Sequence, residues 1–87
     1  LPAEQGAARV RVEAARTQLA AAEQRAALAR EPRGFFDKSF HLGETDLPTR
    51  LRIEAEATDA ARQAIRSRVE LAAAISAWHQ TLGLLPQ

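Results

Sequence analysis

Small and apolar residues recur every three or four positions along both halves of the chain, a spacing typical of amphipathic helices. This pattern predicts one helix from about residue 3 to residue 42 and a second from about residue 46 to residue 83. Each predicted helix carries two such stripes on roughly opposite sides. Because an apolar stripe is buried against a partner, two stripes indicate neighbours on both flanks of each helix.

Arg62 is the only charged residue in the four stripes. In the first helix, one stripe is Val10, Ala14, Thr17, Ala21, Gln24 and Leu28, and the other is Ala8, Val12, Ala15, Leu19, Ala22, Ala26 and Ala29. In the second helix, one is Leu51, Ala55, Thr58, Arg62, Ile65, Val69, Ala72 and Ile75, and the other is Ile53, Ala57, Ala60, Ala64, Ser67, Leu71, Ala74 and Trp78.

A sharp turn is expected between the two helices, at residues 42–46. Gly43 can adopt the left-handed conformation that ends a helix. The side chain of Thr45 or Asp46 can then cap the next helix, and Pro48 falls in its first turn, where a missing N–H does no harm. The chain should therefore stop one helix and restart another at once.

The first helix is interrupted near its end by Pro32 and Gly34. Proline removes one backbone hydrogen bond and crowds the preceding turn, so a kink is favoured over a complete stop. Helical spacing resumes directly afterwards at Phe35, Phe36 and Phe40. These three aromatic side chains are either a partner-binding patch or the packing that clamps the tip.

The length of the second helix determines the expected shape. An unbroken helix of this span would be roughly 55 Å long, whereas a compact domain of this chain length would have a radius of gyration of about 12 to 13 Å. Gly83 is a natural end for this helix. We therefore predict an all-α fold, a single long antiparallel hairpin of coiled-coil type, with its first arm kinked near Pro32.

Composition narrows the possibilities further. The chain has 20 alanines against ten leucines, so it favours helices with thin seams between them. A net charge of +1 argues against nucleic-acid binding, and no apolar run is long enough to cross a bilayer. The absence of cysteine fits a periplasmic location. Because the sequence opens on Leu1 and shows no signal peptide, we expect it to be a piece of a longer protein.

Candidate chemistry is sparse. His41 and His79 should lie tens of ångströms apart in a hairpin, too far to share a metal ion. No nucleophile with an adjacent base, phosphate-binding loop or carboxylate pair is evident, so we expect no enzymatic activity, metal site or cofactor. Glu44 and Asp46 either favour the start of the second helix through its dipole or line a pore mouth that interacts with cations.

Residues 39–86 resemble the second, C-terminal periplasmic hairpin of the TolC family of outer-membrane efflux channels. The resemblance lies in the run Ser39-Phe40-His41-Leu42-Gly43-Glu44-Thr45-Asp46-Leu47 with Leu51, in the long helix that follows, and in Leu82-Gly83-Leu84-Leu85-Pro86. Residues 1–38 match that family in character and carry no motif of it.

The resemblance implies a non-catalytic wall segment of a homotrimeric channel in the outer membrane of a Gram-negative cell. In that family an outer-membrane β-barrel continues into a periplasmic α-barrel, and only the parts outside this sequence would meet the membrane. The channel would work with a periplasmic adaptor (membrane fusion) protein and, indirectly, an inner-membrane pump. The cargo would be small molecules such as drugs, or metal cations. The wall says little about which of them is exported, because selection in that family is largely made at the pump.

The family's tip motif carries over to particular positions. Leu42, Gly43 and Glu44 would contact the adaptor, and Phe40, Thr45 and Asp46 are the gate and tip candidates. Phe40 stands where many members place a gate tyrosine and lacks its hydroxyl group.

Three positions depart from the family's gate pattern. Thr45 replaces a gate arginine of some members, and Thr49 and Arg52 replace acidic residues of a pore ring. The electrostatics of the family gate therefore do not transfer to this chain.

Two alternatives remain beside the channel. One is a free-standing helical hairpin that dimerises into a four-helix bundle and serves as a scaffolding or RNA-binding module. The other is a metal-handling periplasmic helical protein, which would have only two distant histidines available. In either the channel or the bundle, the isolated hairpin should self-associate through its uncovered stripes.

Overall fold

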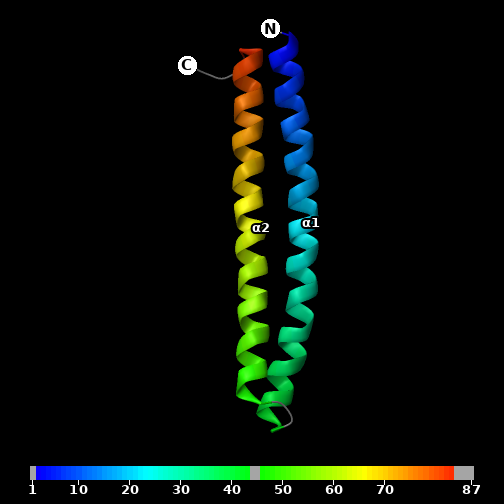
Figure 1. Ribbon diagram of the computed structural model, residues 1–87, viewed down its shortest axis with the longest axis vertical. Coiled ribbons are helices and arrows are strands. Elements are labelled where there is room, and N and C mark those ends of the chain that lie inside the picture. The colour runs from blue at the N-terminus through cyan, green and yellow to red at the C-terminus, as the bar shows by residue number, and fades with distance from the viewer. Residues whose placement is uncertain (1, 44–45, 84–87) are drawn as a thin grey trace.

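The computed structural model describes residues 2–43 and 46–83, which form two long helices lying side by side and antiparallel (Figure 1). Helix α1 spans Pro2–His41 and helix α2 spans Leu47–Leu82, and there is no strand in these residues. The molecule measures 62 × 23 × 15 Å and has a radius of gyration of 19.1 Å. This confirms the predicted all-α hairpin and its rod shape.

The turn begins where the sequence predicts it. Helix α1 ends at His41, and the N–H of Leu42 still donates to the carbonyl of Lys38 over 3.1 Å. Gly43 then has φ +78°, the left-handed conformation that glycine adopts without strain. The start of α1 and the end of α2 lie together at the opposite end of the rod (Figure 1).

Both ends of α2 are capped. At its start, the carboxylate of Asp46 accepts a hydrogen bond of 3.0 Å from the N–H of Thr49, while the Asp46 backbone is extended at φ −80° and ψ 161°. Asp46 is therefore the cap among the described residues, and the other candidate, Thr45, lies outside them. At its end, Gly83 has φ +69°, and its N–H donates to the carbonyl of Gln80 over 3.1 Å.

One stripe of each helix forms the seam between them. The buried or half-buried seam positions recur at alternating intervals of three and four residues, the heptad spacing of a coiled coil. They are Ala8, Val12, Ala15, Leu19, Ala22, Ala26 and Ala29 on α1 and Ile53, Ala57, Ala60, Ala64, Ser67, Leu71, Ala74 and Trp78 on α2.

The core within this seam is thin. Among the described residues, its eight buried apolar side chains are Ala8, Val12, Ala15, Ala22, Ala26, Ile53, Ala57 and Ala64. Six of them are alanines, whose methyl groups let the two helices approach closely but bury little apolar area each. The hairpin by itself therefore gains limited hydrophobic stabilisation, and further packing against neighbours would add to it.

Helix α1 continues through Pro32 without a break. Pro32 and Gly34 are both exposed, so the lost backbone hydrogen bond lies in a part of the helix that is open to water. Figure 1 shows α1 curving and approaching α2 in the segment near the turn. The expectation that the helix does not stop at Pro32 is confirmed.

Polar contacts between the described residues of the two helices include one ion pair and one hydrogen bond. The guanidinium of Arg68 donates to the carboxylate of Glu23 over 3.1 Å, and both side chains are more than half exposed. Near the open end, the Gln5 side-chain amide donates to the carbonyl of Thr81 over 3.4 Å. An exposed ion pair adds little to the free energy of unfolding, so the apolar seam contributes more to the stability of the hairpin than this pair does.

Candidate functional site

The tip of the hairpin presents an apolar residue to solvent. The side chain of Leu42 is 65% exposed, and a Cβ added to Gly43 would meet nothing within 4 Å. Phe40 lies in the last turn of α1, but its side chain, like the whole of Glu44 and Thr45, lies outside the described residues. The structure thus describes two of the three predicted adaptor contacts, both at the accessible end of the rod.

Asp46 is exposed at the tip and is committed to capping α2. Hydrogen bonding from the Thr49 side chain, and next from the Thr49 N–H, lowers the pKa of Asp46 below its ordinary value of 3.8. A smaller lowering comes from the charge of Arg52. This geometry matches the helix-start interpretation of Asp46, because the carboxylate points to the N–H groups that begin α2.

The lowered pKa of Asp46 predicts a pH-dependent stability. A carboxylate whose pKa is lower in the folded state stabilises it fully above pH 3.8, and this contribution disappears as the pH falls through the folded-state pKa. In D46N, the uncharged amide oxygen can still cap the helix but does not titrate. The difference in thermal midpoint between wild type and D46N should be constant well above pH 3.8 and shrink as the pH falls below it. If the thermal midpoints of wild type and D46N differed by the same amount at every pH, the predicted contribution of the Asp46 charge would be contradicted.

Thr49 and Arg52, which were compared with acidic pore-ring positions in the sequence, are uncharged and basic, respectively. Thr49 is half-buried at the start of α2, and Arg52 is exposed. Near the other end of α2, Trp78 is half-buried in the seam, and its ring centroid lies 6.0 Å from that of His79 at a tilt of 34°. No group of three or more His, Asp or Glu side chains that could hold a metal ion occurs within residues 2–43 and 46–83.

The second stripe of each helix faces away from the partner helix and is exposed. On α1, Val10 is 59% exposed and Leu28 is 55% exposed; on α2, Ile65 and Val69 are 57% and 63% exposed. Only Ala21 and Ile75 among these stripe residues are half-buried. We call these surfaces the outer edge of α1 (the stripe that begins at Val10) and the outer edge of α2 (the stripe that begins at Leu51).

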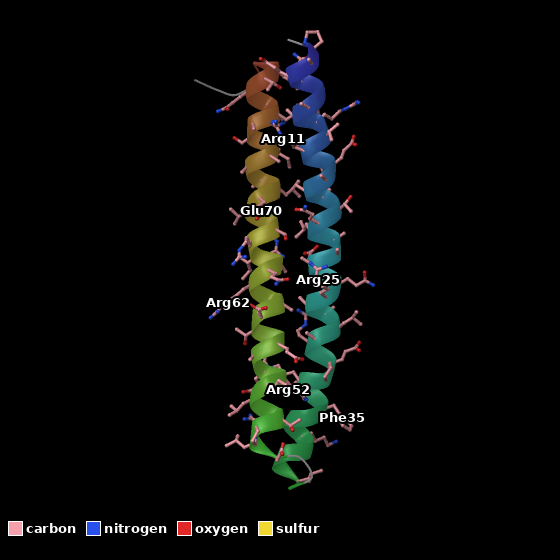
Figure 2. The ribbon with its side chains drawn as sticks, viewed as in Figure 1. Arg11, Arg25, Phe35, Arg52, Arg62 and Glu70 are labelled. Carbon is pink, nitrogen blue, oxygen red and sulfur yellow. The ribbon has the colours of Figure 1, made fainter. Side chains whose placement is uncertain are left out.

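The outer edge of α1 extends to the tip. Leu28, Phe35 and Leu42 follow one another at intervals of seven residues, and each is more than half exposed. Because seven residues are close to two helical turns, these three side chains lie nearly in one line along this side of the rod. In Figure 2, Phe35 projects from the outer side of α1 and Arg62 from the outer side of α2, each away from the facing helix.

The two outer edges lie on opposite sides of the hairpin. At 100° of rotation per residue, each outer edge is centred roughly 150 to 160° around its helix from the seam. The rod therefore has two apolar edges, with its two broad faces between them. Apolar surface arranged in this way marks sites where other proteins or other copies of the chain pack.

A hollow lies across the seam close to the tip. It measures about 440 Å³ and is lined by Arg30, Arg33, Gly34, Arg50 and Glu54. The sequence pattern marks only Gly34 among them, as part of the interruption near Pro32, and none of the four charged residues. The signal that could have found them is the seam spacing itself, because four residues after Ala29 comes Arg33, and three residues before Ile53 comes Arg50.

Comparisons of the chain with protein-family models, with curated proteins and with solved structures find no match. Neither of the two helices, over their described residues, is apolar enough over a sufficient length to cross a membrane.

Proposed function

We propose that this hairpin is a wall segment of the periplasmic tunnel of a TolC-family outer-membrane channel, in a tripartite system that exports small molecules or metal cations. Its outer edges pack against neighbouring hairpins of a homotrimer. Its tip, at Leu42, Gly43 and Glu44, docks the periplasmic adaptor. The resemblance of residues 39–86 to that family suggests this role, and the two opposite outer edges are the observation that carries it.

The outer edges support a row of helices. A helix in a closed ring of helices has one neighbour on each side, so it needs two packing surfaces that are nearly opposite. Each helix of this hairpin has that arrangement, with the seam on one side and an exposed apolar edge roughly 150 to 160° away. The row would continue on both sides of the hairpin.

A four-helix bundle requires a different arrangement. There each helix touches two neighbours at adjacent corners of a square, so its two packing surfaces lie about 90° apart and merge into one wide apolar face. In this hairpin a bundle would have to bury the broad faces. Those faces carry charged residues, among them Arg11, Arg25 and Glu70, which are exposed. The four-helix bundle therefore fits this hairpin less well than the closed ring of helices does.

The rod shape supports the position of the docking site. In a hairpin 62 Å long, the tip lies at the opposite end of the rod from the start of α1 and the end of α2, and a partner can reach it without displacing the seam. Leu42 supplies apolar surface there, and Gly43 leaves room for a close approach of another backbone.

Substitution of Gly43 in the full-length channel tests the proposal. At φ +78° a β-branched residue costs on the order of 1 to 3 kcal/mol, so G43V should distort the turn and abolish export. The measurement is resistance to a panel of drugs and metal salts in cells that depend on this channel.

A matched control distinguishes an effect at the tip from a general effect of replacing glycine with valine. Gly6 lies inside α1, and a Cβ there also meets nothing within 4 Å, but its φ is not positive. G6V should leave export largely intact. Resistance that is unchanged in G43V, at normal amounts of channel in the outer membrane, would refute the docking role of the tip.

A further inference from the structure

We propose that the outer edge of α1 packs against the outer edge of α2 in a second copy of the chain, which stands alongside at the same height with its tip at the same end. Gln24 of one copy and Arg62 of the next meet in this contact and fix its register. The contact rests on the wall function proposed above, because it names what covers the outer edges there. It does not involve the tip residues.

The seam shows which residues of the two helices lie at the same height. One buried cluster spans both helices, and its members are Ala22 and Ala26 on α1 and Ala60 and Ala64 on α2. Midway between these members stand Gln24 on α1 and Arg62 on α2, so these two residues share a height. Because antiparallel helices rise equally, residues the same number of positions before Gln24 and after Arg62 are also level. The hydrogen bond from Gln5 to Thr81 joins two such residues.

Gln24 and Arg62 carry the two long polar side chains of the outer edges. Both are exposed, and Arg62 projects from the outer side of α2, away from the facing helix (Figure 2). Against a purely apolar neighbour, the guanidinium would lose water without gaining an acceptor, which is costly. In copies that stand side by side at one height, the amide oxygen of Gln24 is level with Arg62 and can accept from it. A single polar layer of this kind specifies register in coiled coils.

On both sides of this polar layer, small side chains of one edge are level with large side chains of the other. The level pairs are Thr17 with Val69, Ala21 with Ile65, and Leu28 with Thr58. Val69, Ile65 and Leu28 are each more than half exposed in the single hairpin. Closer to the tip, Phe35 is level with Leu51, so two larger side chains meet there. Large residues opposite small ones allow the two helices to interdigitate.

The charges beside the polar layer include both signs. Asp59 lies three residues before Arg62 on α2, Arg25 follows Gln24 on α1, and all are exposed. Asp59 and the Arg25 of the next copy differ in height by two positions, which is about 3 Å. The Asp59 carboxylate is therefore within reach of both guanidinium groups. Arg66, one turn beyond Arg62, is level with the uncharged Ala20 of the next copy.

Cysteine cross-linking tests the contact, because the chain has no cysteine of its own. Ala14 and Ala72 are exposed, belong to the two outer edges and are level, so a short bis-maleimide should join A14C to A72C when the two variants are mixed. Labelling one variant with ¹⁵N lets mass spectrometry identify the mixed product. The matched control is A55C. Ala55 is exposed on the same edge as Ala72 but about 25 Å nearer the tip, so A14C should not join it.

Two results would overturn the proposal. One is no mixed product of A14C and A72C above that of A14C and A55C. The other is a product of A55C with A72C in its place, which would show two α2 edges paired with their tips at opposite ends. Neither result decides the docking role of the tip, because cross-linking uses the hairpin alone and G43V is measured by export from cells.

The contact between Gln24 and Arg62 has its own test. Q24E places a carboxylate at the height of Arg62 and should strengthen self-association by about tenfold in sedimentation, because a charge-assisted hydrogen bond is stronger than a neutral one. Q63E makes the same change at an exposed position on a broad face of α2 and should associate as wild type does. Equal effects of Q24E and Q63E would reflect net charge alone and would contradict this contact.

Discussion

Replacement of Ile65 and Val69 by glutamate is expected to abolish self-association of the hairpin. Both side chains belong to the outer edge of α2 and are more than half exposed, so the substitutions remove little packing within one hairpin. A neighbour that packs on this edge would have to bury two unpaired carboxylates, which costs several kcal/mol. A loss of about 3 kcal/mol corresponds to a roughly 100-fold weaker association.

Sedimentation velocity over a wide range of concentrations measures this effect. Wild type should form larger species as its concentration rises, and I65E/V69E should remain monomeric. The matched control is Q63E/A77E, which introduces two glutamates at exposed positions on a broad face of the same helix. If that control dissociates the assembly and I65E/V69E does not, the helices pack through their broad faces and the four-helix bundle is the better description. A wild-type hairpin that is monomeric at every concentration would contradict both the row of helices and the four-helix bundle.

The second large effect is expected at the centre of the seam, in the variant A22L. Ala22 is 1% exposed and packs in a cluster with Ala26 and Ala64, to which Ala60 adds a half-buried side chain. A leucine there would have to push the helices apart or leave its preferred rotamer, at a cost of about 1 to 3 kcal/mol. Because a hairpin with so thin a core is only marginally stable, this is a large share of its free energy of unfolding.

Urea unfolding followed by circular dichroism tests A22L against A27L. Ala27 is exposed on the same helix, so leucine at that position should change the free energy of unfolding by less than about 0.5 kcal/mol. A22L should unfold at a clearly lower urea concentration than A27L. Equal midpoints would show that the helices are not in close contact at this layer.

The sequence alone predicts most of the fold, because the signals that set it are local. Gly43 and Gly83 adopt positive φ just after the two helices end. The position of each glycine in the sequence is enough to predict where its helix ends. The length of α2 follows from an uninterrupted helical pattern with no glycine or proline between Pro48 and Gly83. A turn at Gly43 and a second helix of this length together predict an elongated antiparallel hairpin.

The choice between stripes could not be made from the sequence. Both stripes of α1 are small or apolar, and periodicity gives no preference between them. In the structure, the stripe with more alanine forms the seam, and the stripe that includes Leu28 remains exposed, because small side chains permit the closer approach of two helices. This selection depends on contacts between residues far apart in the chain.

The predicted docking residues remain a prediction. Leu42, Gly43 and Glu44 were identified by resemblance to a family motif, and the geometry of a single chain does not include the partner that would contact them. By contrast, the helical pattern is interrupted at Pro32, so periodicity alone does not extend the seam to Arg33 or pair it with the layer of Arg50. Helix α1 passes through it, so the seam spacing extends to Arg33.

The basic layers beside the turn have a consequence for the order in which the chain folds. In a hairpin, contacts nearest the turn close the shortest loops and would ordinarily form first. Here those layers hold the exposed Arg33 and the half-buried Arg50, so their pairing buries little apolar surface. We expect the folding nucleus to lie farther along the arms, where Ala26 meets Ala60 and Ala64. Zipping would then proceed in both directions, and the segments that flank the turn would be the last to pair.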